Sequence, residues 1–80
     1  MNIYKYSFQR DCIVDGKTIC YTLEITTHDQ LMAEDIIDFS TEEPSIQEII
    51  ADQYYNRFGG KQTMIGTHSG VQITTHRGSL

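Results

Sequence analysis

Residues 3–26 read IYKYSFQRDCIVDGKTICYTLEIT and predict a β-hairpin. Apolar and polar residues alternate on both sides of Asp15-Gly16, as they do in strands that bury one face. Asp-Gly is a strong signal for a two-residue type I′ turn, because both central positions of that turn need a positive φ. We therefore expect antiparallel strands over residues 3–14 and 17–26.

The turn also predicts which side chains share a face of the hairpin. Placing Val14 opposite Lys17 and counting outward gives one mainly apolar face and one polar, solvated face. The apolar face holds Tyr4, Tyr6, Phe8, Cys12, Val14, Ile19, Tyr21, Leu23 and Ile25. Arg10 also falls on this face, where we expect its side chain to pass Tyr21 and reach solvent at the sheet edge.

Cys12 and Cys20 fall on opposite faces of the predicted hairpin. Their Cβ atoms then point apart, so we expect no disulfide between them. Free thiols are usual in the reducing cytoplasm, and neither cysteine belongs to a C-x-x-C motif. Both cysteines are therefore interpreted as reduced residues of a cytoplasmic protein.

A first helix is predicted by residues 27–30, Thr-His-Asp-Gln, which match a capping box. It should run to about Phe39 and end before Pro44, because proline disfavours helical geometry at the residue that precedes it. Its buried stripe is expected to contain Met32, Ala33, Ile36 and Phe39. Leu31 and Ile37 fit neither that stripe nor the acidic face opposite it.

A second helix is predicted by residues 45–48, Ser-Ile-Gln-Glu, which form another capping box. It should run from Ile46 to about Phe58 and stop at Gly59-Gly60, because glycine accepts the left-handed conformation of a helix cap. The expected buried stripe is Ile46, Ile49, Ile50 and Tyr54. The expected outer face carries Glu48, Asp52 and Tyr55.

Residues 61–77 predict a second, shorter hairpin that turns at residues 68–70. A two-residue turn would place Met64 and Ile73 on the same face, whereas a three-residue turn would place Ile65 opposite Ile73. Both registers remain open. The element order is therefore ββααββ, and we expect one α+β domain over residues 1–80, with one or two helices packed on one face of a four-stranded antiparallel sheet.

Charge is segregated along the chain. The 80 residues contain six Lys+Arg and eleven Asp+Glu, for a net charge of -5. No Lys or Arg lies between residues 18 and 56, whereas nine carboxylates do: Glu24, Asp29, Glu34, Asp35, Asp38, Glu42, Glu43, Glu48 and Asp52. Such a field selects oppositely charged partners and speeds their approach. Direct nucleic-acid binding is not expected, because domains that bind nucleic acids are typically basic.

Neither a membrane partner nor secretion is expected from this sequence. No apolar run approaches the length of a membrane span, and residues 1–10 lack the basic and apolar regions of a signal peptide. The expected location is the cytoplasm.

No residue pattern predicts an enzyme. His28, His68 and His76 do not have the spacing of metal ligands, and adjacent carboxylates such as Glu34 and Asp35 point in different directions on a helix. Residues 59–63, Gly-Gly-Lys-Gln-Thr, lack the full phosphate-loop pattern and follow a helix rather than a strand. We therefore predict no catalytic residue, no metal and no cofactor.

The leading hypothesis is a non-enzymatic protein whose acidic helical face docks on a basic, nucleic-acid-binding surface of a larger protein and blocks it. The expected contact residues are Leu31, Glu34, Asp35, Ile37, Asp38, Glu42, Glu43, Glu48, Asp52 and Tyr55. In size and charge the chain is similar in type to small inhibitors of phages and other mobile elements, including anti-CRISPR and DNA-mimic proteins. That similarity involves no alignable motif.

Two alternatives remain for the acidic run and for the sheet. The carboxylates would be an ordinary solubilising surface if they contact no partner. The protein would instead be a small self-assembling domain if an edge strand or the outer sheet face pairs with a second copy in a homodimer.

Overall fold

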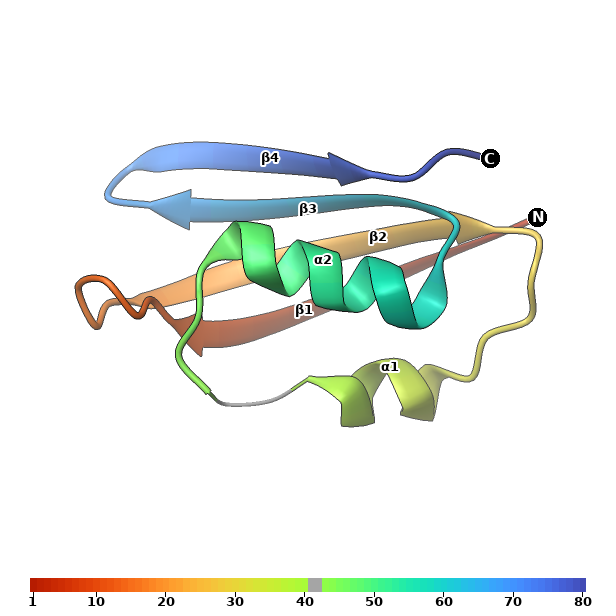
Figure 1. Cartoon of the computed structure of the whole chain (residues 1–80), viewed down its shortest axis with the longest axis horizontal. Helices are drawn as coiled ribbons and strands as arrows, with labels where there is room; N and C mark the ends of the chain where they lie inside the picture. Colours follow the sequence, from red (N-terminus) through yellow and green to blue (C-terminus); the bar gives the residue numbers. More distant parts are fainter. Residues whose placement is uncertain (41–42) are drawn as a thin grey trace.

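Over the described residues, 1–40 and 43–80, this computed structural model has the α+β class and the ββααββ order that the sequence predicts. The strands are β1 (Asn2–Asp11), β2 (Thr18–Thr27), β3 (Lys61–His68) and β4 (Val71–Arg77), and the helices are α1 (Ala33–Phe39) and α2 (Gln47–Phe58). The strands pair in the order β1-β2-β3-β4, and every pair is antiparallel. Figure 1 shows the two helices between β2 and β3 in the chain, with α1 beside β1 and α2 across the sheet.

The first hairpin has the predicted faces but not the predicted register. Phe8 pairs with Tyr21, whereas a type I′ turn at Asp15-Gly16 would have paired it with Leu23. The cause is a longer loop over residues 13–16, in which the Gly16 N–H donates to the Cys12 carbonyl at 2.8 Å and only Gly16 adopts a positive φ. The shift is two residues, and side chains alternate with a period of two, so the side chains within β1 and β2 keep their expected faces. Val14, which was expected on the apolar face, lies instead in the loop and is exposed.

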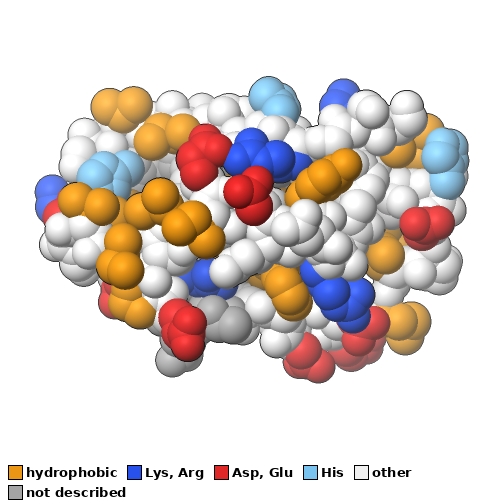
Figure 2. All heavy atoms as spheres, in the orientation of Figure 1, with side chains coloured by type: hydrophobic (Ala, Val, Ile, Leu, Met, Phe, Trp, Pro, Cys, Tyr) orange, Lys and Arg blue, Asp and Glu red, His pale blue; other side chains and the backbone are white. Residues whose placement is uncertain are grey.

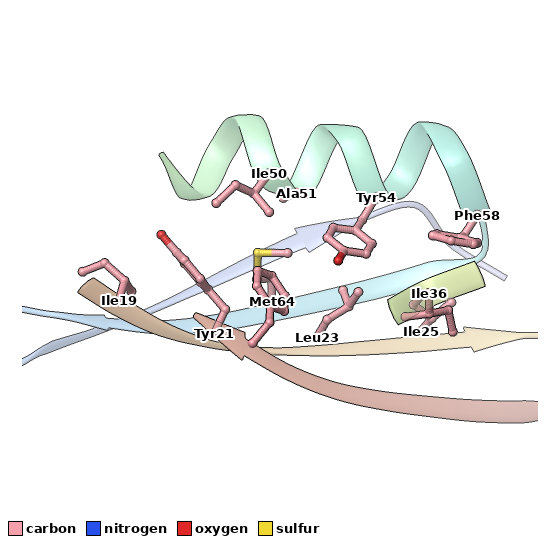
Figure 3. Packing of buried hydrophobic residues seen from close by; sticks show 11 residues of the cluster. Ile19, Tyr21, Leu23, Ile25, Ile36, Ile50, Ala51, Tyr54, Phe58 and Met64 are labelled. Carbon is pink, nitrogen blue, oxygen red and sulfur yellow. The ribbon is translucent and has the colours of Figure 1, made fainter. Parts of the chain in front are cut away.

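The core lies between the sheet and α2 (Figure 3). Ile50, Tyr54 and Phe58 point from the helix toward the strands, where they meet the side chains of β2 and of Met64 on β3. The buried apolar side chains are Phe8, Ile19, Tyr21, Leu23, Ile25, Ile36, Ile50, Ala51, Tyr54, Phe58 and Met64. The hydrophobic face predicted for the first hairpin therefore forms most of the sheet side of this core.

Arg10 does not reach solvent as predicted. Its side chain lies in the core layer opposite Ile19, with 4% of its surface exposed, and its guanidinium carbon is 5.8 Å from the centre of the Phe8 ring. Its Nε has no hydrogen-bond partner among the described residues. The shifted register pairs Arg10 with Ile19 rather than with Tyr21, and its side chain stays on the face that packs against the core.

Neither predicted capping box starts a helix. Thr27 remains in β2, where it is buried and pairs with Asn2, and its Oγ1 accepts a hydrogen bond from the Asp29 N–H at 3.1 Å. The helix α1 begins only at Ala33. Strand pairing thus extends through the position that local sequence assigns to the cap, because the sheet offers Thr27 both hydrogen bonds and burial.

The second predicted capping box, at residues 45–48, does not form because Ser45 contacts a strand that is distant in the sequence. The Ser45 backbone pairs with the end of β1, donating to the Asp11 carbonyl at 3.0 Å and accepting from the Ile13 N–H at 3.1 Å. The α2 helix then begins at Gln47, with Ile46 at the N-cap and no side-chain cap hydrogen bond. Glu48, which the capping box would direct back to Ser45, binds Arg77 instead. Gly59 ends the helix with a positive φ of 66°, as predicted.

The helices bury fewer of their predicted stripe residues than expected. On α2, Ile50 and Tyr54 are buried as predicted, but Ile49 is exposed. On α1, Ile36 is buried, whereas Met32 at the N-cap and Ala33 are exposed. The late start of α1 moves those two residues to its first turn, away from the sheet.

The second hairpin adopts the two-residue turn. His68 pairs with Val71 across Ser69 and Gly70, whose φ values are 51° and 82°. This geometry places Met64 and Ile73 on the face toward α2 and so decides between the two open registers.

Two further expectations concern the thiols and the membrane. Cys12 and Cys20 are both free cysteines, and they lie on opposite faces of the sheet as predicted. Among the described residues, no helix is both long and apolar enough to cross a lipid bilayer.

Candidate functional site

The acidic residues of α1 form the first part of the candidate site. Glu34, Asp35 and Asp38 are exposed, and Figure 2 shows carboxylates gathered over this helix at the lower edge of the molecule. None of the three forms an ion pair within the described part of the chain. Glu34 and Asp35 lie in the first turn of the helix, where negative charge favours helix formation.

Exposed apolar residues accompany these carboxylates. Ile37 on α1 is 52% exposed, and Met32 at the N-cap is also exposed. We call the surface made by Met32, Glu34, Asp35, Ile37 and Asp38 the α1 face. It combines negative charge that has no ion pair in the described part of the chain with exposed apolar side chains.

The acidic residues of α2 are arranged differently, because Arg77 of β4 pairs with both of them. The Arg77 Nε donates to Asp52 Oδ1 at 2.8 Å, and its Nη2 donates to Glu48 Oε2. These hydrogen bonds, first that to Asp52 and then that to Glu48, raise the pKa of Arg77 above its usual value. Two of the predicted contact residues are therefore paired within the chain, with one cation from outside the acidic run.

The predicted contact residues do not form one surface. The helix α2 packs over β3 and β4, whereas α1 packs against β1. Tyr55 of α2 is exposed on the β4 side, close to Gly78, where a Cβ would come within 2.5 Å of the Tyr55 ring. The structure therefore brings together Glu34, Asp35, Ile37 and Asp38, but it separates them from Glu48, Asp52 and Tyr55.

Three other predicted contact residues have different surroundings. Leu31 is partly buried against the core, and its N–H donates to the Tyr4 hydroxyl at 3.0 Å, so it does not project outward as expected. Glu43 is exposed in the connection between the helices. Glu42 lies outside the described residues.

Sequence reasoning missed an apolar surface at the opposite end of the molecule. Apolar side chains gather at the left-hand end of Figure 2, where the loop between β1 and β2, the start of α2 and the start of β4 meet. Val14 and Ile73 are exposed there and line a hollow of about 220 Å³, and Ile49 and Val71 are also exposed on α2 and β4. The signal in the sequence was weak, because these apolar residues are divided between a loop, α2 and β4.

The same end of the molecule holds three side chains with metal-binding atoms. Cys12, Asp15 and His68 each offer one such atom, and these atoms all lie within 4.8 Å of one another. Asp15 Oδ2 and His68 Nε2 are 2.9 Å apart. The sequence analysis did not predict this cluster, because His68 is distant in the chain and is brought to the loop only by the order of the strands.

Comparison with protein-family models, with curated proteins and with solved structures gives no match to this chain.

Proposed function

We propose that this protein is a non-enzymatic binding protein that docks through the α1 face on a basic surface of a larger protein, such as a nucleic-acid-binding groove, and blocks that surface. The cytoplasm is the proposed location. The observation that carries the proposal is the state of Glu34, Asp35 and Asp38, three exposed carboxylates without an ion pair in the described part of the chain.

In the proposed contact, the charged and the apolar side chains have different roles. Exposed carboxylates speed the encounter with a basic partner and set its orientation, but each contributes little to the final affinity once it is solvated at the rim. Ile37 and Met32, which are exposed beside the carboxylates, supply the area that is removed from water on docking. The α1 face thus offers a partner both negative charge and exposed apolar area.

The role of α2 differs from that expected from the sequence. Glu48 and Asp52 already bind Arg77, so using them for a partner would first require breaking two charge-assisted hydrogen bonds. The proposed contact is therefore smaller than the full acidic run and is centred on α1.

A homodimer through the sheet is the second candidate function. β1 and β4 are the edges of the sheet, and one face of the sheet carries no helix. That open face is mainly polar and includes Ser7, Thr22, Thr63 and Thr74. Edge strands with free backbone groups favour pairing with a second copy.

Affinity capture from a host lysate with charge-reversed baits tests the main proposal. Glu34→Lys with Asp38→Lys should abolish capture of a basic partner that the unmodified chain retains at low salt and releases at high salt. Asp11→Lys with Glu24→Lys is the matched control, because it lies on the open face and also changes the net charge from -5 by +4 to -1. Equal loss with both double variants would show that net charge, not the α1 face, governs capture.

Light scattering after size-exclusion chromatography tests the second candidate. A stable dimer at micromolar concentration would support pairing through the sheet. A monomer at that concentration would argue against the homodimer.

A further inference from the structure

We propose that Cys12, Asp15 and His68 form a binding site for one zinc ion, at the end of the sheet opposite the chain termini. The ligand set is one thiolate, one carboxylate and one imidazole, and all three are established zinc ligands. Cys12 and Asp15 come from the loop between β1 and β2, and His68 is the last residue of β3. This inference is independent of the α1 face and of the function proposed for it.

The distances suit a tetrahedral ion with small side-chain adjustments. Zinc lies about 2.3 Å from sulfur and about 2.0–2.1 Å from nitrogen or oxygen, so two of its ligand atoms are separated by about 3.3–3.6 Å. The three ligand atoms lie within 4.8 Å of one another, and Asp15 Oδ2 is 2.9 Å from His68 Nε2. Binding therefore requires the sulfur to approach and the carboxylate and imidazole to separate slightly, while all three continue to face one point.

Backbone hydrogen bonds hold the two loop ligands in place. The Cys12 N–H donates to the Lys17 carbonyl, and the Cys12 carbonyl accepts from the Gly16 N–H, each at 2.8 Å. The Lys17 N–H donates to Asp15 Oδ1 at 3.0 Å, which leaves Oδ2 directed at His68. Such outer contacts orient metal ligands in known sites and reduce the cost of assembling them.

The arrangement favours a metal site over a cysteine nucleophile. A nucleophilic thiol needs a hydrogen bond to its base, and within the described residues the Cys12 thiol donates none to His68. The charges also balance, because a thiolate and a carboxylate together neutralise a divalent zinc ion. Three protein ligands leave one coordination position, which a water molecule would fill beside the apolar hollow lined by Cys12, His68 and Ile73.

Cobalt(II) titration of the full reduced chain is the primary experiment, because cobalt reports its ligands by absorption. We expect saturation at one cobalt per chain, with a thiolate charge-transfer band and tetrahedral visible bands, and displacement of the cobalt by zinc. Cys12→Ser should remove the charge-transfer band, and His68→Gln or Asp15→Asn should weaken binding by about tenfold or more.

The chain supplies matched controls for the cysteine and the histidine ligand. Cys20→Ser and His76→Gln alter the same residue types on the open face of the sheet, and both variants should keep the full cobalt spectrum. Absence of saturable binding, or loss of the spectrum in either control variant, would overturn the proposal.

A second measurement uses the unmodified chain and so does not depend on the folding of any variant. Zinc should slow alkylation of Cys12 strongly while leaving the rate at Cys20 unchanged, as read by mass spectrometry of peptides. Equal alkylation rates at Cys12 with and without zinc would overturn the proposal, as would equal protection of both thiols.

Discussion

Arg77 on β4 and Asp52 on α2 are joined by a hydrogen bond of 2.8 Å from Nε to Oδ1, across 25 residues of sequence. The same guanidinium also binds Glu48 one helical turn earlier. One cation from the C-terminal strand therefore pairs with two carboxylates of the acidic run and links α2 to the edge of the sheet. The pairing adds to the apolar packing of Ile50, Tyr54 and Phe58, which holds α2 against the sheet.

Replacing this arginine should loosen the attachment of α2. Arg77→Gln should lower the melting temperature, because Asp52 and Glu48 lose their partner and then repel each other at helical spacing. Lys61→Gln is the control, since it removes the same charge from an exposed position on the open face. Thermal unfolding followed by circular dichroism compares the two variants.

Salt should reduce the difference between those variants. At about 1 M ionic strength the Debye length falls to about 3 Å, and exposed ion pairs lose much of their strength. Equal melting temperatures for Arg77→Gln and Lys61→Gln at low salt would contradict the assigned role of Arg77.

The register of the first hairpin can be tested by cross-linking. In a Cys12→Ser background, Gln9→Cys should form a disulfide with Cys20 under mild oxidation, because Gln9 and Cys20 are paired residues. Asp11→Cys is the control, since a type I′ turn at Asp15-Gly16 would instead place residue 11 opposite Cys20. Mass spectrometry of the oxidised proteins gives the disulfide yields. Faster disulfide formation by Asp11→Cys than by Gln9→Cys would instead support the type I′ turn at Asp15-Gly16.

The hairpin also shows which structural features local sequence predicts. Alternation of apolar and polar residues gave the correct faces, because that signal depends only on a period of two. The turn failed because Ile13 bonds to Ser45, which lies far along the chain, so a tertiary contact selected the longer loop. The missed helix caps have the same origin, since Thr27 and Ser45 are held by strand pairing.

The candidate site was predictable only where it lies on one helix. Glu34, Asp35 and Asp38 share α1, so helical periodicity alone placed them together. The pairing of Asp52 with Arg77 and the meeting of Asp15 with His68 depend on which strands are neighbours, and local patterns carry no such information. Long-range contacts of this kind follow only from the complete topology.

Leu23 and Thr22 are neighbours on β2 but lie on opposite faces of the sheet, so the same substitution should affect stability very differently at the two positions. Leu23→Asp should unfold the domain, because Leu23 is 1% exposed and an unpaired buried carboxylate costs several kcal/mol, much of the stability of a small domain. Thr22→Asp, on the open face, should be nearly neutral. Comparable urea midpoints for the two variants would contradict the assignment of Leu23 to the buried face and Thr22 to the open face.

Gly66 on β3 is required by close packing rather than by backbone conformation. A Cβ at this position would lie 2.7 Å from the Tyr21 ring and 2.8 Å from Gln47 Oε1. Gly66→Ala should therefore destabilise the protein by about 1–3 kcal/mol, although alanine normally suits a strand better than glycine. Chemical denaturation measures the loss, with Thr67→Ala on the open face as the control. A Gly66→Ala variant as stable as the unmodified chain would exclude this packing.

The apolar residue of the α1 face should control how long a complex lasts. Ile37→Ser removes apolar area from the centre of the proposed contact, so the captured partner should dissociate faster while its association rate changes little. Ile49→Ser on α2 is closely matched, because Ile49 is 48% exposed and Ile37 is 52% exposed, yet Ile49 lies outside the α1 face. Surface plasmon resonance with the captured partner separates the two rates. Faster dissociation with Ile49→Ser than with Ile37→Ser would move the contact from α1 to the exposed surface of α2.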